Sequence, residues 1–401
     1  MTTKYPFSMW VYNPLSDFPP EELESWKECG MTAPLAPKTY YGKDDPKSLI
    51  PYLDKAQELG MLLIINYEDF AYQNIDRIGD ELYEERFREM YEPLKGHPAL
   101  FGFFAGDEPN SRRSFDQTRR CLMIQKKVAP ELRPYINLIG GMSDKKEDQL
   151  LDMDLEEWFR DLKSIGIDFV SQDAYLPLID DRTVTDHFRE MKKIIEAAEK
   201  AGVDVWINML CSGHDAFRAP SETDVIWQVN VGAAIGCRGG IWFRFYDREI
   251  GYDYFGSPVD EFGNKTNCYY AILRAQRRFN NQYGELMMKL KRKSTYATGY
   301  QKRGIYPELN DKAHDLVTVS GYEDGIVSFF EDAEGSEYIA IVNASMQFRA
   351  TWVIDYDPEK CVVKEVSANG RHERTLGGPE CAGTENCFHT GQFRLFHIIR
   401  K

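Results

Sequence analysis

The sequence predicts a mixed α/β protein, with a (β/α)8 TIM barrel over residues 1–300 and a small all-β sandwich domain over residues 301–401. Two observations lead to this fold class. In the first part, short apolar runs alternate with amphipathic helical stretches, which is typical of a parallel sheet with crossover helices. After about residue 300, short β-rich runs follow one another and Gly, Asp and Asn separate them, which is typical of a β-sandwich.

Eight apolar runs of the first part are expected to be strands. Met61–Tyr67 reads MLLIINY, the continuous apolar pattern of a buried strand. Thr32–Lys38 is the weakest of the eight because it contains two prolines. The full set is Phe7–Tyr12, Thr32–Lys38, Met61–Tyr67, Leu100–Ala105, Arg133–Ile139, Ile167–Gln172, Val203–Leu210 and Gly239–Phe245.

A helix is expected after each of these strands, as a TIM barrel requires. The expected helices are Pro20–Cys29, Ser48–Leu59, 80–94, Arg113–Val128, Leu155–Ile165, Val184–Ala201, Ser221–Ile235 and Asn267–Leu290. Ser221 and Asp224 form a near capping box at the start of one of them. A doubly wound open sheet is the alternative, although the first strand runs into YNPLSDFPP, which has no glycine for a phosphate loop.

The second part contains six β-rich runs, namely Leu316–Ser320, Gly325–Glu331, Tyr338–Asn343, Phe348–Ile354, Cys361–Val366 and Phe393–Ile399. The stretch Thr295–Asp315 is expected to join the two parts. The acidic segment EDAEGSE, residues 331–337, is expected to be a solvated hairpin turn and not a calcium site.

Composition narrows the classes of partner. The formal net charge is −15, which argues against nucleic acid and against an anionic membrane surface. No signal-peptide pattern and no long apolar run is present, so a cytoplasmic location is expected. The eight cysteines are scattered and are expected to be reduced, with Cys381 and Cys387 the one pair that could bridge.

Side chains just past the strand ends should gather at one mouth of a TIM barrel. These positions are rich in carboxylates and aromatic rings, and they are Trp10, Tyr12, Asn13, Lys38, Asn66, Tyr67, Glu68, Asp69, Asp107, Glu108, Asn137, Gln172, Asp173, Tyr175, Asn208, Ser212, His214, Trp242, Arg244, Tyr246 and Asp247. Rings stack on the apolar faces of sugars, and carboxylates and amides bond sugar hydroxyls. The composition of this rim favours a carbohydrate substrate, with no metal and no cofactor.

The sharpest local signal is FFAGDEPN, residues 103–110, in which Asp107 and Glu108 precede Pro109. Proline biases the residue before it toward an extended conformation, so Glu108 is expected to be extended. The motif resembles that of the large TIM-barrel clan of glycoside hydrolases, whose general acid/base is the second residue of a dipeptide before proline at the end of strand four. In much of that clan the first residue is Asn, where this chain has Asp107.

The Asp-Glu-Pro form is similar to a broad set of uncharacterised glycosidase-like proteins with a C-terminal β-sandwich. In these a strand-six Asp-x-Tyr recurs, matched here by Asp173 and Tyr175. A Glu that opens the last-but-one barrel helix is matched by Glu222, and a Gly-rich start of strand eight by residues 239–242. The resemblance extends over nearly the whole chain and implies a glycoside hydrolase with Glu108 as the general acid.

One departure concerns the second carboxylate. Retaining members of the clan end strand seven in a nucleophilic Glu, but this chain reads VWINMLCSGHD there, and Asp215 comes several residues late. Either another carboxylate or the substrate takes that role, or the chain is a non-catalytic carbohydrate-binding barrel. Asp173 is the first choice for the partner and Glu68 the second.

The separation of the two carboxyls sets the mechanism. A gap of about 5–5.5 Å permits nucleophilic attack, and about 6.5–9.5 Å leaves room for an activated water. With a non-standard partner, the longer gap is expected. Glu108 is expected in the largest rim pocket with a raised pKa, because burial and the charge of Asp107 both disfavour ionisation.

The expected catalytic residues are therefore Glu108, Asp173 and Asp107. The expected substrate-binding residues are Trp10, Tyr12, Asn66, Tyr67, Glu68, Asn137, Tyr175, Asn208, Trp242, Arg244 and Tyr246. Structural alternatives are an ion pair of Asp173 with Arg244, and core packing for the tyrosines and Trp242.

Two other chemistries are weaker. Cys211 and His214 lie three residues apart and lack an evident orienting Asn or Asp, which argues against a Cys-His nucleophile. An aldolase-type barrel would need a strand-end lysine, for which only Lys38 qualifies.

Overall fold

The computed structural model describes residues 4–140, 154–176, 184–247, 254–299, 305–366, 373–378 and 383–401. Cys381, the expected partner of Cys387, lies outside these residues. Six buried cysteines of the described part are free thiols, namely Cys29, Cys121, Cys211, Cys237, Cys268 and Cys361. Among the described residues, no helix is long and apolar enough to cross a membrane.

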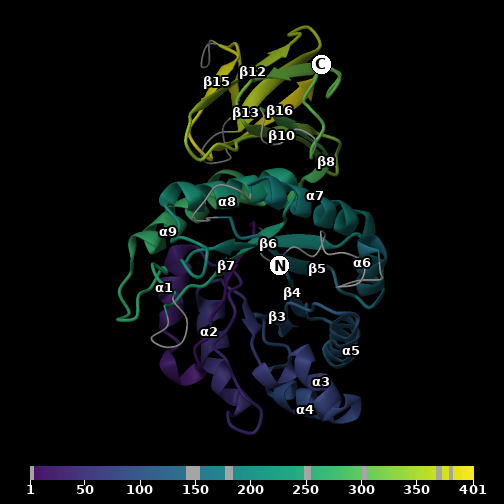
Figure 1. Ribbon diagram of the computed structural model, residues 1–401, viewed down its shortest axis with the longest axis vertical. Helices are drawn as coiled ribbons and strands as arrows, with labels where there is room; N and C mark the ends of the chain where they lie inside the picture. Colours follow the sequence, from purple (N-terminus) through teal and green to yellow (C-terminus); the bar gives the residue numbers. More distant parts are fainter. Residues whose placement is uncertain are drawn as a thin grey trace.

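A curled parallel sheet of seven strands forms the centre of the first part, in the order β1-β7-β6-β5-β4-β3-β2 (Figure 1). The strands are β1 (Phe7–Met9), β2 (Leu63–Ile65), β3 (Leu100–Asp107), β4 (Tyr135–Leu138), β5 (Phe169–Asp173), β6 (Asp204–Leu210) and β7 (Gly239–Phe243). Each corresponds to one of the runs expected from the sequence. The alternation of strands and helices is therefore confirmed.

Helices surround this sheet on its outer side (Figure 1). They are α1 (Glu22–Cys29), α2 (Ile50–Glu58), α3 (Ile75–Ile78), α4 (Asp80–Tyr91), α5 (Arg112–Val128), α6 (Leu155–Ser164), α7 (Val184–Ala201), α8 (Glu222–Ile235), α9 (Asn267–Phe279) and α10 (Glu285–Lys289). The expected helix Asn267–Leu290 is interrupted by a π-helical turn at Asn280–Gly284. At the start of α8 the predicted capping box is present, since Asp224 N donates to Ser221 Oγ and Ser221 N donates to the Asp224 carboxylate.

Residues 32–39 lie between the two edge strands β1 and β2. Thr32 N donates to Phe7 O at 2.8 Å on one side, and Ile64 N donates to Pro34 O at 3.0 Å on the other. The segment is not a regular strand because Pro34 and Pro37 have no N–H to donate to a ladder. The weak prediction for Thr32–Lys38 thus located the chain correctly between its neighbours.

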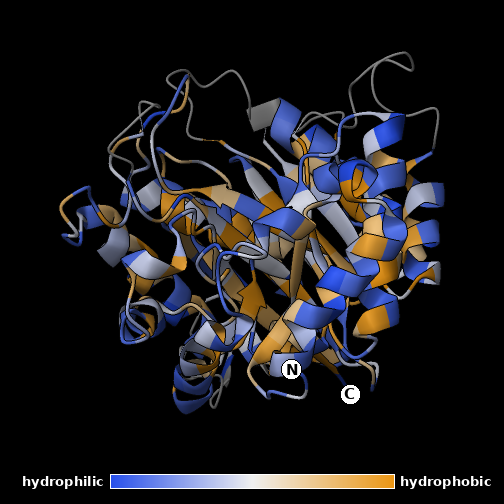
Figure 2. Ribbon diagram, turned by 90° about the horizontal axis from the view of Figure 1, so that it is seen from below, coloured by the Kyte–Doolittle hydropathy of each residue, from blue (hydrophilic) through white to orange (hydrophobic). Residues whose placement is uncertain are grey.

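The two faces of the curled sheet form separate apolar layers. The inner face is lined by Trp10, Ala33, Leu35, Ile64, Phe101, Phe104, Tyr135, Phe169, Trp206 and Ile241. The outer face packs under the helices, whose hydrophilic sides point outward (Figure 2). Because successive strand residues alternate between these faces, the inner set determines which side chains can reach the mouth.

The C-terminal part contains two antiparallel sheets, one of six strands ordered β14-β13-β16-β11-β10-β8 and one ordered β15-β12-β9. Their bounds are β8 (Lys291–Thr298), β9 (Val317–Ser320), β10 (Gly325–Glu331), β11 (Glu337–Asn343), β12 (Ala350–Tyr356), β13 (Cys361–Val366), β14 (Glu373–Thr375), β15 (Glu385–Phe388) and β16 (Phe393–Arg400). Side chains from both sheets pack into one core around Trp352. β8 precedes residue 300 and yet belongs to this part, and β10 and β11 form the hairpin expected around residues 331–337.

The C-terminal sheets pack against α8 and α9 (Figure 1). The Trp227 indole N–H donates to the Ala344 carbonyl at 2.8 Å, and the Asn230 amide donates to the Gly391 carbonyl at 2.8 Å. The rings of Phe279 and Phe393 lie 5.8 Å apart. This contact is on the outer side of the sheet, away from the strand ends that carry the acids.

Candidate active site

Four neighbouring strands bring two carboxylates and two carboxamides together at their carboxyl ends. The strand register pairs Asp107 with Asn137 and Asp173 with Asn208. Asn137 Nδ2 donates to Asp107 Oδ1 at 2.9 Å and to Asp173 Oδ1 at 2.8 Å. Asn208 Nδ2 donates to the same Asp173 oxygen at 2.7 Å, and its own oxygen accepts from the Trp10 indole at 3.2 Å. The amides therefore hold both carboxyls in fixed positions.

The backbone turns sharply after β3. Gly106 has φ 135°, and a Cβ there would lie 2.3 Å from the Tyr72 ring, so only glycine fits. Tyr72 Oη donates to the Asp107 carbonyl at 3.0 Å, and Glu108 N donates to the Asn137 carbonyl at 3.0 Å. Glu108 has φ 49°, so the expectation of an extended residue before Pro109 was wrong. The hydrogen bonds on both sides of it outweigh the local bias and set the turn.

This turn brings the Glu108 carboxyl within hydrogen-bonding reach of the Asp173 carboxyl. An ionised carboxylate only accepts hydrogen bonds, so a hydrogen bond between these two carboxyls requires that one of them is protonated. Asp173 is 7% exposed, whereas Glu108 is exposed, so the acid expected to be buried is the accessible member of the pair.

The carboxyls with raised pKa values are the two aspartates. Burial raises the pKa of Asp107 to about 7, the Asn137 hydrogen bond opposes the shift, and the charge of Glu108 adds to it. Burial also raises the pKa of Asp173, with further contributions from the Asp107 charge and the hydrogen bond shared with Glu108. The site therefore retains a proton at a pH where isolated carboxyls are ionised.

An aromatic wall borders these acids. The Tyr175 and Phe243 rings stack with centroids 5.5 Å apart, and Tyr12 meets Phe243 edge-on at 6.0 Å. The Arg244 guanidinium lies 5.1 Å from the Tyr12 ring centroid and 4.9 Å from that of Tyr254. Tyr12, Tyr175 and Arg244 are thus at the mouth, as the sequence predicted, and Arg244 Nε donates to the Tyr246 carbonyl.

This wall also contains Phe217, Phe243 and Tyr254, which were not among the rim residues expected from the sequence. Phe243 could have been found from the two-residue period of its strand if Ile241 had been assigned to the inner face. Phe217 and Tyr254 belong to segments between regular elements, for which sequence periodicity carries no signal.

Three predicted substrate-binding residues are not brought to the mouth. Trp242 is fully buried on the outer side of the sheet, where its indole nitrogen faces the Gln276 amide of α9. Tyr67 is 1% exposed and donates to the Met90 carbonyl at 2.8 Å. Tyr246 points its hydroxyl to Glu22 on α1. For Trp242 and Tyr67 the core-packing alternative describes their positions.

The remaining predicted residues lie near the acids or pair elsewhere. Asn66 is buried, and its Oδ1 has no hydrogen-bond partner among the described residues. Glu68 forms an ion pair with Lys38 at 2.8 Å, and the Lys38 ammonium lies 5.1 Å from the Tyr12 ring centroid. Glu222, which matches a motif of the resemblance at the start of α8, forms an exposed ion pair with Arg274 at 2.7 Å.

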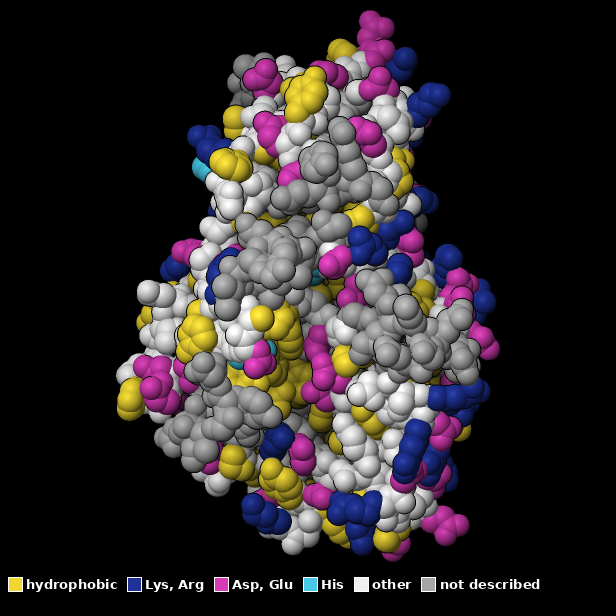
Figure 3. Space-filling model, in the orientation of Figure 1, with side chains coloured by type: hydrophobic (Ala, Val, Ile, Leu, Met, Phe, Trp, Pro, Cys, Tyr) yellow, Lys and Arg dark blue, Asp and Glu magenta, His cyan; other side chains and the backbone are white. Residues whose placement is uncertain are grey.

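A cavity of about 390 Å³ opens beside the acid pair, with Glu108, Asp173 and Tyr175 in its lining. Figure 3 shows a hollow near the middle of this face, with acidic side chains beside hydrophobic ones. The larger cavities of the described structure lie away from the carboxyl ends of the strands, so they do not bear on the expectation that Glu108 lies in the largest pocket of the rim.

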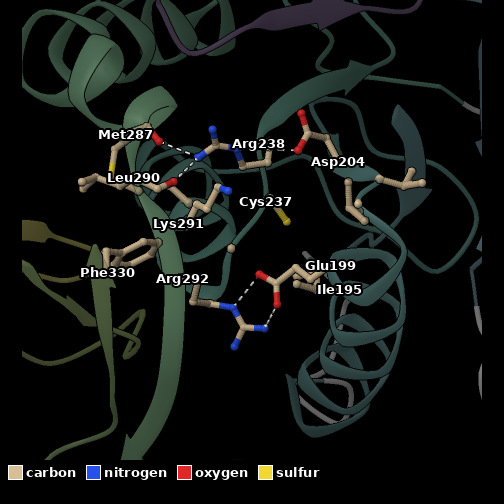
Figure 4. A pocket seen from close by; sticks show the side chains of 15 residues that line it. Ile195, Glu199, Asp204, Cys237, Arg238, Met287, Leu290, Lys291, Arg292 and Phe330 are labelled. Atoms are coloured by element: carbon tan, nitrogen blue, oxygen red, sulfur yellow. Dashed lines mark hydrogen bonds and ion pairs between the residues drawn. The ribbon is translucent and has the colours of Figure 1, made fainter. Parts of the chain in front are cut away.

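One of these larger cavities, about 410 Å³, lies at the opposite ends of β6 and β7 (Figure 4). Its charged groups serve the structure. Arg238 Nη1 donates to the carbonyls of Met287 and Leu290 at 2.6 and 2.7 Å, and Arg292 forms an ion pair with Glu199. In the described lining of this cavity, the carboxyls of Glu199 and Asp204 therefore lie beside arginines.

Solved structures of glycoside hydrolases share this architecture. A glycoside hydrolase family 5 protein from Bacteroides vulgatus matches with a TM-score of 0.60 at 10% identity, over 98% of this chain and 89% of that chain. A structure described as a glycoside hydrolase matches with a TM-score of 0.61 at 10% identity, over 98% and 92% of the two chains. The chain has a glycosidase-like fold.

A β-galactosidase from the psychrophilic Marinomonas ef1 matches with a TM-score of 0.56 at 11% identity, over 74% of this chain and 63% of that chain. This chain thus spans less than two thirds of that enzyme. At such identities the likeness shows the fold alone. No family model and no curated protein matches the sequence.

Proposed function

We propose that the protein is a glycoside hydrolase that cleaves an oligo- or polysaccharide by general acid catalysis. The observation that carries this proposal is the cluster of Glu108, Asp173 and Asp107 at the carboxyl ends of the strands, where Glu108 and Asp173 line a cavity and burial raises the pKa of both aspartates. Glycosidases need a protonated carboxyl beside an ionised one. An aromatic wall beside the pair suits the apolar face of a sugar ring.

The proposed architecture is a closed (β/α)8 barrel followed by a β-sandwich. Residues 32–39 supply the eighth strand of a closed (β/α)8 barrel, because their backbone is hydrogen-bonded to both β1 and β2. The two C-terminal sheets form a β-sandwich around their common core. In such a barrel, the site lies at the end where enzymes of this fold hold their catalytic residues.

The roles follow from the contacts. Asp173 accepts two amide hydrogen bonds on one oxygen, which orients its carboxyl, and the bond from Asn137 opposes the rise in pKa that burial causes. Glu108 is exposed, so it is the acid of this cluster that can pass a proton to the leaving oxygen of a bound glycoside. Asp107 lies beside both, and its charge state sets how firmly the pair holds the proton.

In the hydrogen-bonded arrangement, no substrate bond fits between the two carboxyls. Binding of a sugar must therefore separate them. A final gap of about 5–5.5 Å would make Asp173 a nucleophile, and about 6.5–9.5 Å would let it activate a water. The anomeric configuration of the first product, measured by NMR, distinguishes these two courses.

The test is a panel of aryl glycosides and oligosaccharides assayed with the wild type and with Glu108→Gln. The variant should lower kcat by roughly 100-fold or more, since general acid catalysis contributes that much. Glu84→Gln is the matched control, because Glu84 is ion-paired with Lys127 on the surface. Wild-type activity in Glu108→Gln would overturn the proposal. Saccharide binding without turnover would instead indicate a non-catalytic carbohydrate-binding barrel.

A further inference from the structure

A cavity of about 460 Å³ lies where α8 and α9 meet the C-terminal part, and the proposed chemistry does not use it. Its walls come from α8, α9, the π-helical turn Asn280–Gly284 and the segment 389–393 between β15 and β16. Figure 1 shows the C-terminal sheets on the side of α8 that faces away from the parallel sheet. A cavity of this volume suits a small molecule.

The floor of this junction cavity is apolar. The rings of Phe279, Tyr283 and Phe393 line it and pack on one another, with centroid distances of 5.0 to 5.9 Å. Ile226 of α8 and Leu273 of α9 also line it and are only partly buried, so part of their apolar surface is open to a ligand. A ligand with an apolar body would remove this surface from water, which favours binding.

The rim of the junction cavity is basic, in a chain whose formal net charge is −15. Its described lining contains the exposed arginines Arg274, Arg277 and Arg278, all on α9, and one carboxylate, Glu222. Arg274 Nε and Nη2 donate to the two Glu222 oxygens at 2.7 and 2.8 Å, so these two charges cancel. The other two arginines leave the described lining with a net positive charge, which attracts an anion.

Arg278 is the arginine best placed to pair with that anion. It lies one helical turn after Arg274, so the two side chains share a face of α9. Among the described residues, the Arg278 side chain has no hydrogen-bond or ion-pair partner. Burial and the charge of Glu365 raise the pKa of Tyr283, and the charges of Arg394 and Arg278 oppose the shift. The Arg278 guanidinium therefore lies within electrostatic range of the Tyr283 hydroxyl at the cavity floor.

The polar groups of the lining favour an apolar body over a sugar. The Asn230 amide already donates to the Gly391 carbonyl at 2.8 Å, and Gln392 Oε1 accepts from His389 N at 2.9 Å. Saccharide hydroxyls placed on the aromatic floor would lose water without gaining hydrogen bonds, which costs free energy. A carboxylate suits the rim because a guanidinium can donate to both of its oxygens at once.

We propose that the junction cavity binds a small organic anion, a carboxylate on an aromatic or aliphatic frame, with Arg278 pairing the carboxylate. The frame would cover the floor between α9 and Phe393, so the ligand would contact both parts of the molecule. A ligand that binds only the folded protein raises its melting temperature. This site is separate from the acids at the strand ends, so its test does not depend on glycosidase activity.

The first experiment measures binding to the full chain by isothermal titration calorimetry, with matched probes. The Kd of 3-phenylpropionate should be about 1 mM or lower, a reasonable affinity for a ligand of this size. The amide 3-phenylpropionamide, which keeps the frame and lacks the charge, should bind roughly 10-fold more weakly or worse, because a charge-assisted hydrogen bond is lost. Acetate, which keeps the charge and lacks the frame, should also bind at least about 10-fold more weakly.

The second experiment changes the rim with exposed residues, so the variants should fold, which their melting curves check. Arg278→Ala should weaken binding of 3-phenylpropionate about 10-fold, and Arg278→Lys should recover part of the loss because it keeps the charge. Glu222→Gln should act in the opposite direction and strengthen binding severalfold, because it removes a carboxylate and releases Arg274. Arg349→Ala, at an exposed position of the C-terminal part, is the matched control and should bind like the wild type.

Three outcomes would overturn the proposal. The first is absence of 3-phenylpropionate binding, or equal binding of its amide. The second is equal affinity in Arg278→Ala and Arg349→Ala, which would place the ligand elsewhere. The third is self-association of the chain that Arg278→Ala abolishes, measured by light scattering, because the cavity would then be covered by a second copy. Tighter binding of glucuronate than of 3-phenylpropionate would likewise replace the apolar anion by an acidic sugar.

Discussion

The two ends of the parallel sheet surround their acidic side chains with different partners. At the amino ends of the strands, acids face arginines, as Asp168 does with Arg133 at 2.8 Å and Glu199 with Arg292 at 2.5 Å. At the carboxyl ends, Asp107 and Asp173 receive hydrogen bonds from neutral amides and lie close to one another. The first arrangement neutralises charge, and the second retains protons.

Within one sheet, the amino ends are therefore expected to contribute to stability, and the carboxyl ends to proton transfer. Pairing an acid with an arginine favours the folded state only when both partners remain, so the amino ends should be sensitive to truncation. Crowding acids without cations raises their pKa values and costs stability whenever they ionise. Carboxyls with raised pKa values are common at catalytic sites, so the proposed activity is expected at the carboxyl ends of the strands.

The largest effect is expected at Asp173. Asp173→Asn should lower kcat by roughly 1,000-fold, because the amide can neither hold nor return the shared proton. The free energy of unfolding should not fall, since the raised pKa shows that the folded state disfavours this charge. Activity assays and urea unfolding measure the two quantities on one preparation.

Asp161→Asn is the matched control for this substitution, because Asp161 lies on α6 in a surface ion pair with Arg119 at 2.7 Å. It should retain full activity. Equal losses of activity in Asp161→Asn and Asp173→Asn would remove the distinction between the carboxyl ends and the rest of the molecule.

At the amino ends, replacement of Arg238 is expected to lower stability and to leave activity unchanged. Arg238→Met should lower the free energy of unfolding by about 3 kcal/mol, because the carbonyls of Met287, Met288 and Leu290 lose charge-assisted hydrogen bonds. The kcat of the folded variant should be unchanged. Loss of activity in excess of the unfolded fraction would show that this end of the sheet also serves catalysis.

Features of the two ends that depend on contacts local in sequence could be predicted, whereas features that depend on contacts distant in sequence could not. Strands and helices follow local periodicity, and α5 was placed within one residue of its observed start, Arg112. Asp107, Glu108, Asn137, Asp173 and Asn208 could be collected because strand ends in a parallel sheet meet at one edge. For these positions the register is the only long-range information needed.

Side-chain direction at the same edge could not be derived in this way. Trp242 faces outward because its indole fits against Gln276 of α9, and Phe243 then points inward. Tyr67 is drawn into the core by the Met90 carbonyl, and Glu108 turns toward Asp173 against the bias of Pro109. Each of these outcomes depends on a partner distant in sequence, which no local pattern contains.

The free energy of unfolding should depend on pH because Asp107, at the carboxyl end of β3, has a raised pKa in the folded protein. In the unfolded chain Asp107 loses its proton near pH 3.9, whereas in the folded protein its pKa is about 7. Between these values the folded state binds more protons, so the free energy of unfolding falls as pH rises, by about 1.4 kcal/mol per pH unit for one such group. Below pH 4 and above pH 7 this group contributes no slope.

Asp107→Asn removes that titration and still offers an oxygen to Asn137. The difference in unfolding free energy between wild type and variant, measured in urea from pH 4 to pH 8, should therefore grow with pH in favour of the variant. In Asp161→Asn, whose acid is ion-paired, no such trend is expected. Parallel curves for wild type and Asp107→Asn would show that Asp107 ionises normally in the folded protein.

The smallest effect is expected for Tyr67, which the sequence placed in the substrate site and the structure places in the core. Tyr67→Phe removes one buried hydroxyl and its hydrogen bond to the Met90 carbonyl, so it should lower the free energy of unfolding by about 1 kcal/mol. KM should not change, because the Tyr67 ring packs on Phe103 at a centroid distance of 5.5 Å and not on the cavity.

Tyr175→Ala is the comparison at the mouth, where loss of a ring that lines the cavity should raise KM severalfold. If Tyr67→Phe raised KM as much as Tyr175→Ala does, the assignment of Tyr67 to the core would be wrong. Its hydroxyl, which donates to the Met90 carbonyl, would then affect substrate binding.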